Sequence, residues 1–190
     1  IASCLVGSEM CIRDSNNTIT DILNKIEVKA GDVVMVKAGT IHAIGAGVFI
    51  CEIQQNSNCT YRMYDYDRRD KFGNPRELHV KKALDVVDNH KYIKDNKTEV
   101  VIARNEHFTE ERLVQCKYFE VYKYDVNDEA KITVDEASFV SVLFINGSGT
   151  IETDDYEKTM EFKAGDSFFV SAGLRSIIIK GQATMVVTRV

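Results

Sequence analysis

One histidine, His42, stands directly after an Ala-Gly turn in the pattern Gly31-Asp32, Lys37, Gly39, His42. Turn residues ahead of His42 place its imidazole at the start of an extended segment, at the rim of a sheet. A neutral imidazole in such a position can ligate a divalent metal ion. A hydrogen-bonded core or surface histidine would show the same pattern, so the pattern alone leaves both interpretations open.

The second candidate is Arg62, in the segment Thr-Tyr-Arg-Met-Tyr-Asp-Tyr-Asp at 60–67. If this segment is a strand, alternation places Arg62 on one face with Tyr64 and Tyr66. An arginine among aromatic and hydroxyl groups can bind an anion or stabilise developing oxyanion charge. The alternative is a solvated arginine paired with Asp65 or Asp67, both of which we expect to be structural partners rather than a catalytic base.

An internal repeat indicates which elements position these residues. Lys-Ala-Gly-Asp-Val-Val-Met-Val-Lys-Ala-Gly at 29–39 matches Lys-Ala-Gly-Asp-Ser-Phe-Phe-Val-Ser-Ala-Gly at 163–173. Each copy predicts a turn, a short β-prone run and a second turn, after a segment of alternating apolar residues. Ser176 stands in the second copy where the first has His42, so we expect the second copy to be structural and free of metal.

The rest of the chain is predicted to be short strands, with one helix at Val80–Val87 where apolar residues recur with helical spacing. Asn146-Gly147-Ser148-Gly149 is predicted to be a turn between two strands. The regular spacing of the strands favours a barrel or sandwich. Strands are expected at 48–54, 60–66, 118–124, 131–134, 139–144, 150–152, 167–170, 176–180 and 183–188.

Composition narrows the classes of partner. The 190 residues carry 24 Lys and Arg against 29 Asp and Glu, a net charge of −5, and 44% of them are apolar. Proteins that bind nucleic acid or anionic membranes more often carry a surplus of basic residues, so we expect neither partner. Five irregularly spaced cysteines form no metal or disulfide framework, which favours a reducing, cytoplasmic setting.

Three regions are predicted along the chain. Residues 4–15 resemble one reading frame of a sequencing-library adapter, and residues 1–15 are therefore expected to be non-native. Residues 16–98 are expected to form one unit with a helix and a polar linker at 88–98. Residues 99–190 are expected to form a second, metal-free unit.

Two resemblances follow from these motifs. The Gly-Asp, Gly and His pattern is similar to the second conserved motif of cupins, with Lys37 where proline is usual and Ala46 where asparagine is frequent. Beyond that, Ala-Gly-Thr-Ile-His-Ala-Ile at 38–44, Glu-Ile-Gln-Gln-Asn-Ser at 52–57, Thr-Tyr-Arg-Met-Tyr-Asp-Tyr-Asp-Arg at 60–68 and Gly-Asn-Pro-Arg-Glu-Leu-His at 73–79 resemble class I mannose-6-phosphate isomerases of the short bacterial form. This resemblance extends from about residue 22 to residue 190.

The resemblance implies an all-β double cupin with a short helical insertion, the first barrel being incomplete. It implies a zinc-dependent isomerase that interconverts mannose 6-phosphate and fructose 6-phosphate by proton transfer through an enediol. In that scheme His42 matches the last zinc ligand and Arg62 matches the active-site arginine. His79, in the last of the four motifs, is expected to be structural.

The same resemblance implies that the other zinc ligands belong to a His-Pro stretch and a Lys-x-Glu stretch, neither of which occurs in these 190 residues. We therefore expect the chain to correspond to the C-terminal half to two-thirds of such an enzyme, with neither stoichiometric zinc nor turnover on its own. One alternative is a non-catalytic sugar-binding or regulatory cupin. Another is an iron oxygenase, which the setting of Arg62 disfavours because dioxygen chemistry needs no anion-binding arginine there.

Overall fold

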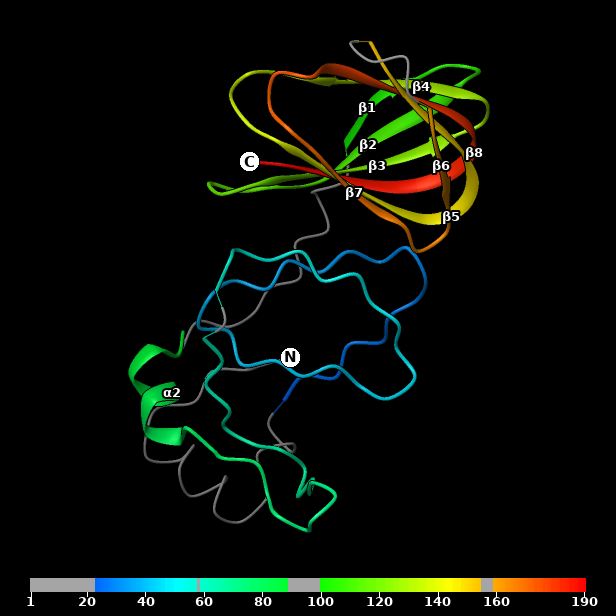
Figure 1. The fold of residues 1–190 in the computed structure, drawn as a ribbon. Coiled ribbons are helices and arrows are strands. Elements are labelled where there is room, and N and C mark those ends of the chain that lie inside the picture. The colour runs from blue at the N-terminus through cyan, green and yellow to red at the C-terminus, as the bar shows by residue number, and fades with distance from the viewer. Residues whose placement is uncertain (1–22, 58, 89–99, 155–158) are drawn as a thin grey trace. The chain divides into compact units, whose positions relative to one another are not determined.

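The computed structural model describes residues 23–57, 59–88, 100–154 and 159–190 (Figure 1). The chain divides into two compact units, residues 1–94 and 95–190. The predicted adapter-like segment and all but the first residue of the predicted linker lie outside the described residues. None of the described helices has the length and apolar character needed to cross a membrane.

The second unit is a single eight-stranded antiparallel sheet. Its strands follow the order β1-β2-β3-β8-β5-β6, with β4 also pairing with β8 and β7 with β5. The strands are β1 (Val100–Arg104), β2 (Phe108–Gln115), β3 (Glu120–Val126), β4 (Glu129–Val134), β5 (Val140–Thr153), β6 (Met160–Lys163), β7 (Ser167–Val170) and β8 (Arg175–Arg189).

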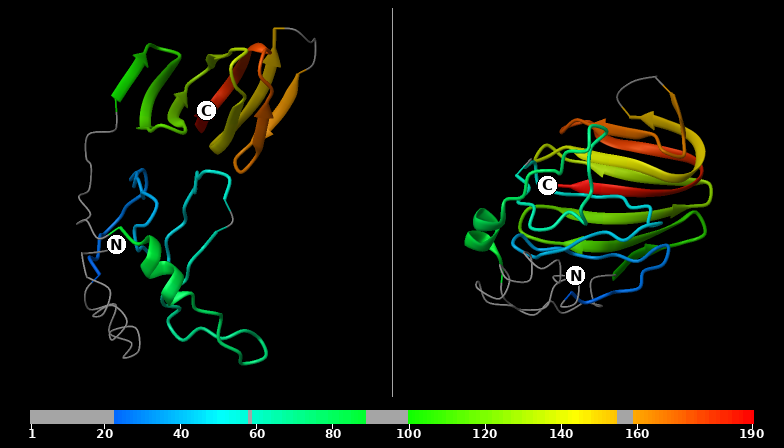
Figure 2. Two further views of the ribbon diagram at one scale, coloured as in Figure 1. Left: turned by 90° about the vertical axis from the view of Figure 1, so that its left-hand side faces the viewer. Right: turned by 90° about the horizontal axis from the view of Figure 1, so that it is seen from below.

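Two long strands bend this sheet into two layers, as Figure 2 shows. The C-terminal part of β8 pairs with β3, and its N-terminal part pairs with β4. Strand β5 pairs with β7 at its beginning and with β6 at its end, and lies along β8 throughout. The predicted turn at 146–149 is therefore wrong, because these residues continue β5. Gly147 and Gly181 have φ values of +90° and +125°, and a Cβ on either would meet backbone of the facing strand, so glycine permits this bend.

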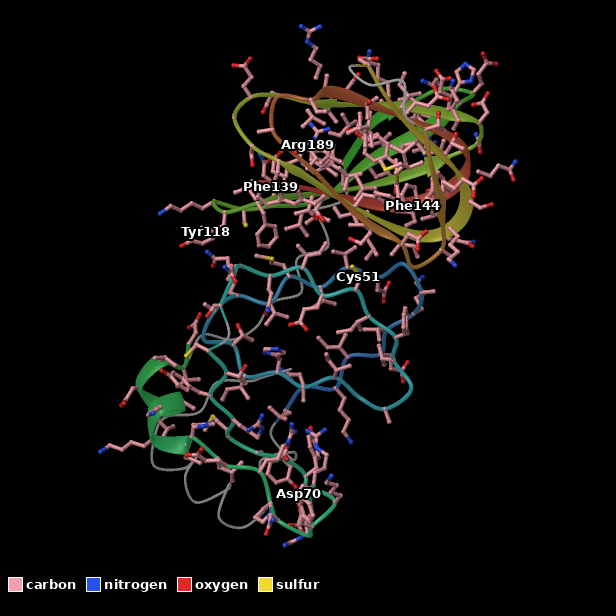
Figure 3. All side chains as sticks on the ribbon, in the orientation of Figure 1. Cys51, Asp70, Tyr118, Phe139, Phe144 and Arg189 are labelled. Atoms are coloured by element: carbon pink, nitrogen blue, oxygen red, sulfur yellow. The ribbon has the colours of Figure 1, made fainter. Side chains whose placement is uncertain are left out.

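The core of the second unit lies between the two layers. Phe144, labelled in Figure 3, is fully buried, and its ring stacks on that of Phe162 with a centroid separation of 3.7 Å. The alternation of buried residues along β4, at Ala130, Ile132 and Val134, is the period expected for a strand with one face inward. This part of the chain therefore has the packed interior of an independent β unit.

The first unit is built differently. Its one described helix, α2 (Val80–Val86), agrees with the predicted helix at 80–87. The predicted strands at 48–54 and 60–66 are not formed: these segments are extended, but no neighbouring described segment supplies the ladder of hydrogen bonds that defines a strand. Phe49 is consequently fully exposed, and the buried apolar side chains of the described part of this unit are Met63 and Ala83.

The two copies of the repeat nevertheless form the same turn. Backbone N–H of Asp32 donates to the carbonyl of Lys29 at 3.1 Å, and the Asp32 carboxylate accepts from the Lys29 N–H at 3.2 Å. Asp166 and Lys163 make the same two bonds at 3.1 and 2.9 Å. The repeat predicted from the sequence is thus confirmed as a repeated local structure.

Candidate functional site

Helix α2 anchors the segment that carries His42. The N–H of Asp88, just after the helix, donates to the carbonyl of Gly39 at 2.9 Å. Gly39 has φ of +83°, and a Cβ there would lie 2.7 Å from the carbonyl oxygen of Val86. Ile41 packs against the buried pair Met63 and Ala83. The turn before His42 is therefore held directly against the helix.

His42 itself is exposed, and its ring has one fixed partner. Nδ1 lies 2.9 Å from the carbonyl oxygen of Thr40. Because a carbonyl only accepts, Nδ1 carries a proton, which in the neutral ring leaves the lone pair on Nε2. Metal-binding histidines are commonly fixed in this way by a backbone carbonyl. His42 thus fits the role of a single Nε2 ligand.

A full ligand set is not assembled by the described parts of the chain. No group of three or more His, Cys, Asp or Glu side chains lies together there in a way that could hold a metal ion. A catalytic zinc takes three protein ligands as a rule. The described residues therefore supply one candidate zinc ligand, His42, and not a complete zinc site.

Arg62 is tied to the residue that precedes α2. Its backbone N–H donates to Nδ1 of His79 at 3.3 Å, and its carbonyl accepts from the His79 N–H at 2.7 Å. Its guanidinium donates through Nη1 to the carbonyl of Glu77 at 3.1 Å. One turn of chain at 77–79 thus fixes both the backbone and the side chain of Arg62, and the contacts of His79 are of a structural kind.

A buried carboxylate lies beside Arg62. Asp65 is only 6% exposed, and its Oδ1 is 3.7 Å from Nε of Arg62. Arg68 donates to the same oxygen at 2.7 Å, and Arg76 binds both carboxylate oxygens, with Nε to Oδ2 at 2.7 Å. The hydrogen bond from Arg76 is the main cause that lowers the pKa of Asp65 to about 2. The contact with Asp65 agrees with the alternative interpretation of Arg62 as a partner of this carboxylate, but the Arg62 side chain is only 25% exposed and Asp65 is also bound by Arg68 and Arg76.

The predicted alternation along 60–67 holds only in part. Met63 and Asp65 are buried and Arg62 and Tyr64 are less so, as alternation requires. The pattern ends at Tyr66 and Asp67, whose φ values of 53° and 51° turn the chain away. The sequence does not identify Arg68 and Arg76 as partners of one carboxylate, because Asp65 comes into contact with both only in the folded chain.

The equivalent of His42 in the second unit is a different kind of site. Ser176, at the start of β8, is 1% exposed and donates its hydroxyl hydrogen bond to Asp154. Lys131 also binds Asp154, at 3.1 Å. Ser176, Asp154 and Lys131 thus form a polar network in which the serine is buried and the lysine is largely exposed. Unlike the segment around His42, this network includes no histidine among its described residues.

Comparison with known proteins decides the family. Residues 109–190 match the family model for the cupin domain of mannose-6-phosphate isomerase. YvyI of Bacillus subtilis is 42% identical over 174 residues, which cover 89% of this chain and 52% of that protein. The crystal structure of the mannose 6-phosphate isomerase from Bacillus subtilis superimposes with a TM-score of 0.87 at 36% identity, covering 99% of this chain and 58% of that one. The chain belongs to the mannose-6-phosphate isomerase family.

Other members of the mannose-6-phosphate isomerase family give the same result. Mannose-6-phosphate isomerase ManA of Bacillus subtilis is 34% identical over 178 residues, which cover 88% of this chain and 52% of the relative. The chain thus spans about half the length of the curated relatives it matches. With this family and fold, the predicted all-β cupin architecture with a short helical insertion is confirmed.

Proposed function

We propose that this chain contributes His42 and Arg62 to the active site of a zinc-dependent isomerase that interconverts mannose 6-phosphate and fructose 6-phosphate. The observation that supports it most strongly is the common anchoring of the two residues. Helix α2 begins directly after His79, which is hydrogen-bonded to Arg62. Just after its other end, Asp88 donates to the carbonyl of Gly39, three residues before His42. Segments distant in sequence are thereby held to one element, in a chain similar throughout to a mannose 6-phosphate isomerase.

The reaction moves a proton between C1 and C2 of the sugar through an enediol, and negative charge develops on the sugar oxygens as the proton leaves. A bound zinc ion would supply Lewis-acid stabilisation of that charge. Arg62 supplies a fixed cation, since its guanidinium is a quarter exposed and is held by Glu77 and Asp65. Its remaining N–H groups have no partner among the described residues and can donate to substrate oxygens.

His42 has the companion role of holding the zinc ion through Nε2, with Nδ1 fixed by Thr40. The further ligands are expected in the His-Pro and Lys-x-Glu stretches of the family, which these 190 residues do not contain. A cytoplasmic location fits the free thiols of Cys51, Cys59 and Cys116, since a reducing compartment preserves them.

The test is an isomerase assay of two proteins: the 190-residue chain and the product of the complete open reading frame that contains it. We expect the latter to convert mannose 6-phosphate to fructose 6-phosphate, with activity lost on chelation and restored by zinc. We expect no turnover from the 190 residues alone. A zinc-loaded full product without activity would overturn the proposal and favour the sugar-binding or regulatory cupin.

A further inference from the structure

Arg189, the last residue of β8 and labelled in Figure 3, carries a buried hydrogen-bond donor. Its Nε is shielded from solvent, and the parts of the chain that the structure describes supply no acceptor for it. Cζ of Arg189 instead lies 5.2 Å from the centre of the Tyr122 ring. A shielded, unpaired donor on a charged group costs free energy, and native proteins retain few of them. Arg189 therefore carries a cost that stability alone does not explain.

The carboxylate that lies opposite Arg189 is bound to other groups. Glu120 pairs with Arg189 in the register of β3 and β8. One of its oxygens accepts from the hydroxyl of Tyr122 at 2.6 Å, and the other accepts from the side-chain amide of Gln115. Burial, and after it the hydrogen bond to Glu120, raises the pKa of Tyr122, so the hydroxyl keeps the proton that it donates. Two neutral groups thus hold Glu120 in place.

A second arginine lies on the other side of Tyr122. Arg112 of β2 is the cross-strand partner of Tyr122, so the two side chains share one face of the sheet. The Arg112 guanidinium makes no hydrogen bond or ion pair across the described strands. Burial is the main cause of the raised pKa of Tyr122, and the charges of Arg112 and Arg189 both oppose it. Two half-buried guanidiniums therefore lie near one tyrosine, one on each neighbouring strand.

We propose that Arg112 and Arg189 form a binding site for the carboxylate group of a small organic acid, beside Tyr122 on the second unit. Guanidinium and carboxylate are both planar and can form two parallel, charge-assisted hydrogen bonds. Because Nε of Arg189 is shielded, this residue would present its Nη groups to the ligand. The Tyr122 ring already holds the Arg189 guanidinium, so less side-chain freedom is lost on binding.

The charge around the two arginines favours a singly charged ligand. Glu120 and Glu110 lie on the same face of the sheet, and each accepts from a tyrosine hydroxyl, Glu110 from Tyr124 at 2.5 Å. These two acids offset much of the positive charge, so a phosphate dianion would meet repulsion that a monocarboxylate largely avoids. All of these residues belong to the second unit, so the inference goes beyond the proposed isomerase function and does not depend on it.

Binding is measured by NMR of the arginine side-chain Nε–H groups, in the 190-residue chain and in the complete gene product, at constant ionic strength. The probe is propionate. Propionamide has the same shape without the charge, and inorganic phosphate supplies the dianion. Arg112→Gln is the test variant. Arg104→Gln is the matched control, because it removes the same charge from an exposed position at the end of β1 in the same unit.

We expect propionate to shift the Nε–H resonances of Arg112 and Arg189, propionamide to leave them unchanged, and phosphate to bind more weakly than propionate. Affinity for propionate should fall at least about tenfold in Arg112→Gln and less than about twofold in Arg104→Gln. Equal weakening in the two variants, or phosphate binding tighter than propionate, would overturn the proposal. Shifts that vanish in the complete gene product would mean that the rest of the enzyme occupies the site, and would overturn it as well.

Stability separates a ligand site from a structural role. Arg189→Met replaces the guanidinium by an apolar side chain and removes the shielded donor. We expect this variant to lose propionate binding, and to melt in calorimetry without ligand at the same temperature as the unsubstituted chain or higher, because no unpaired charged group remains half-buried. A clearly lower melting midpoint would show that Arg189 serves the fold, and the proposal would then be wrong.

Discussion

Oδ1 of Asp65 lies 3.7 Å from Nε of Arg62, and the same buried carboxylate binds Arg68 and Arg76. The first unit has few buried apolar side chains among its described residues, so this polar cluster is a large part of what holds the segment 62–79 together. The arginine assigned to catalysis is thus positioned by a residue that does not itself need to contact substrate.

Asp65→Asn should destabilise the first unit, because three guanidiniums would remain around a neutral amide. The expected result is a lower unfolding midpoint for this unit, measured by urea titration with NMR detection at the amides of Arg62 and His79. Asp67→Asn is the control: the Asp67 side chain is 73% exposed and is paired with Arg69, so the midpoint of this variant should stay close to that of the unsubstituted chain. Equal effects from the two substitutions would mean that the cluster around Asp65 has no special structural role.

Acid should weaken the same unit in a defined range of pH. The folded-state pKa of Asp65 is lowered from an ordinary value of 3.8 to about 2, chiefly by the hydrogen bond from Arg76. A lowered carboxylate pKa stabilises the fold fully above its unfolded value, and this contribution is lost as the pH falls toward 2. The midpoint of the first unit should therefore decline between pH 4 and pH 2, and Asp65→Asn should remove that part of the decline. A variant that declines as steeply as the parent contradicts the assignment.

The second unit should have a pH response of its own, at His107. Nδ1 of His107 donates to Asp128 at 2.9 Å, which raises the pKa of His107 above 6.5 and lowers that of Asp128 below 3.8; Glu106 and Glu129 also favour the charged histidine. The stabilisation from His107 is present below pH 6.5 and is lost as the pH rises through its folded-state pKa. The stabilisation from Asp128 is instead lost as the pH falls through the folded-state pKa of Asp128.

His107→Gln measures this contribution directly. We expect it to lower the melting midpoint of the second unit at pH 5.5 and to have a smaller effect at pH 8.5, because the stabilisation from the charged histidine is lost as the pH rises. Differential scanning calorimetry at the two pH values provides the comparison. The same shift at both pH values would mean that the charged pair contributes nothing.

The contact between Gly39 and helix α2 is a further point of sensitivity. Gly39→Ala combines the cost of a positive φ, about 1–2 kcal/mol, with overpacking against Val86 that costs about 1–3 kcal/mol. Gly47→Ala is a matched control with a similar φ of +78° and open space around the new Cβ, so only the first cost applies. Urea unfolding of the first unit should show the larger loss for Gly39→Ala. Equal losses would mean that the close approach to Val86 yields easily.

The fold was predictable where local signals are sufficient. The turns at Lys29–Asp32 and Lys163–Asp166 follow from matching tetrapeptides, and the helix follows from its apolar period. The sequence did not predict that β5 continues through 146–149. Glycines that suggest a turn also permit a strand to bend while it stays paired with β8. Alternation in 60–66 suggested a strand, but a strand also requires a partner within hydrogen-bonding distance.

The candidate site was predictable to a similar extent. His42 and Arg62 stand in short motifs, and such motifs can be found in one pass along the chain. The contacts that fix these residues join Gly39 to Asp88 and Arg62 to His79, and no periodicity links positions so far apart. The sharing of Asp65 by three arginines is likewise a product of folding.

The most direct test of the account is a pair of substitutions in the complete gene product, assayed for isomerisation of mannose 6-phosphate together with bound zinc. Arg62→Ala should lower kcat about 10²–10³-fold while zinc content is retained, since a fixed oxyanion-stabilising donor is removed. His42→Ala should lose both zinc and activity, and His107→Ala in the second unit should lose neither. Full activity and full zinc content in Arg62→Ala and His42→Ala would contradict the central claim that these two residues belong to the active site.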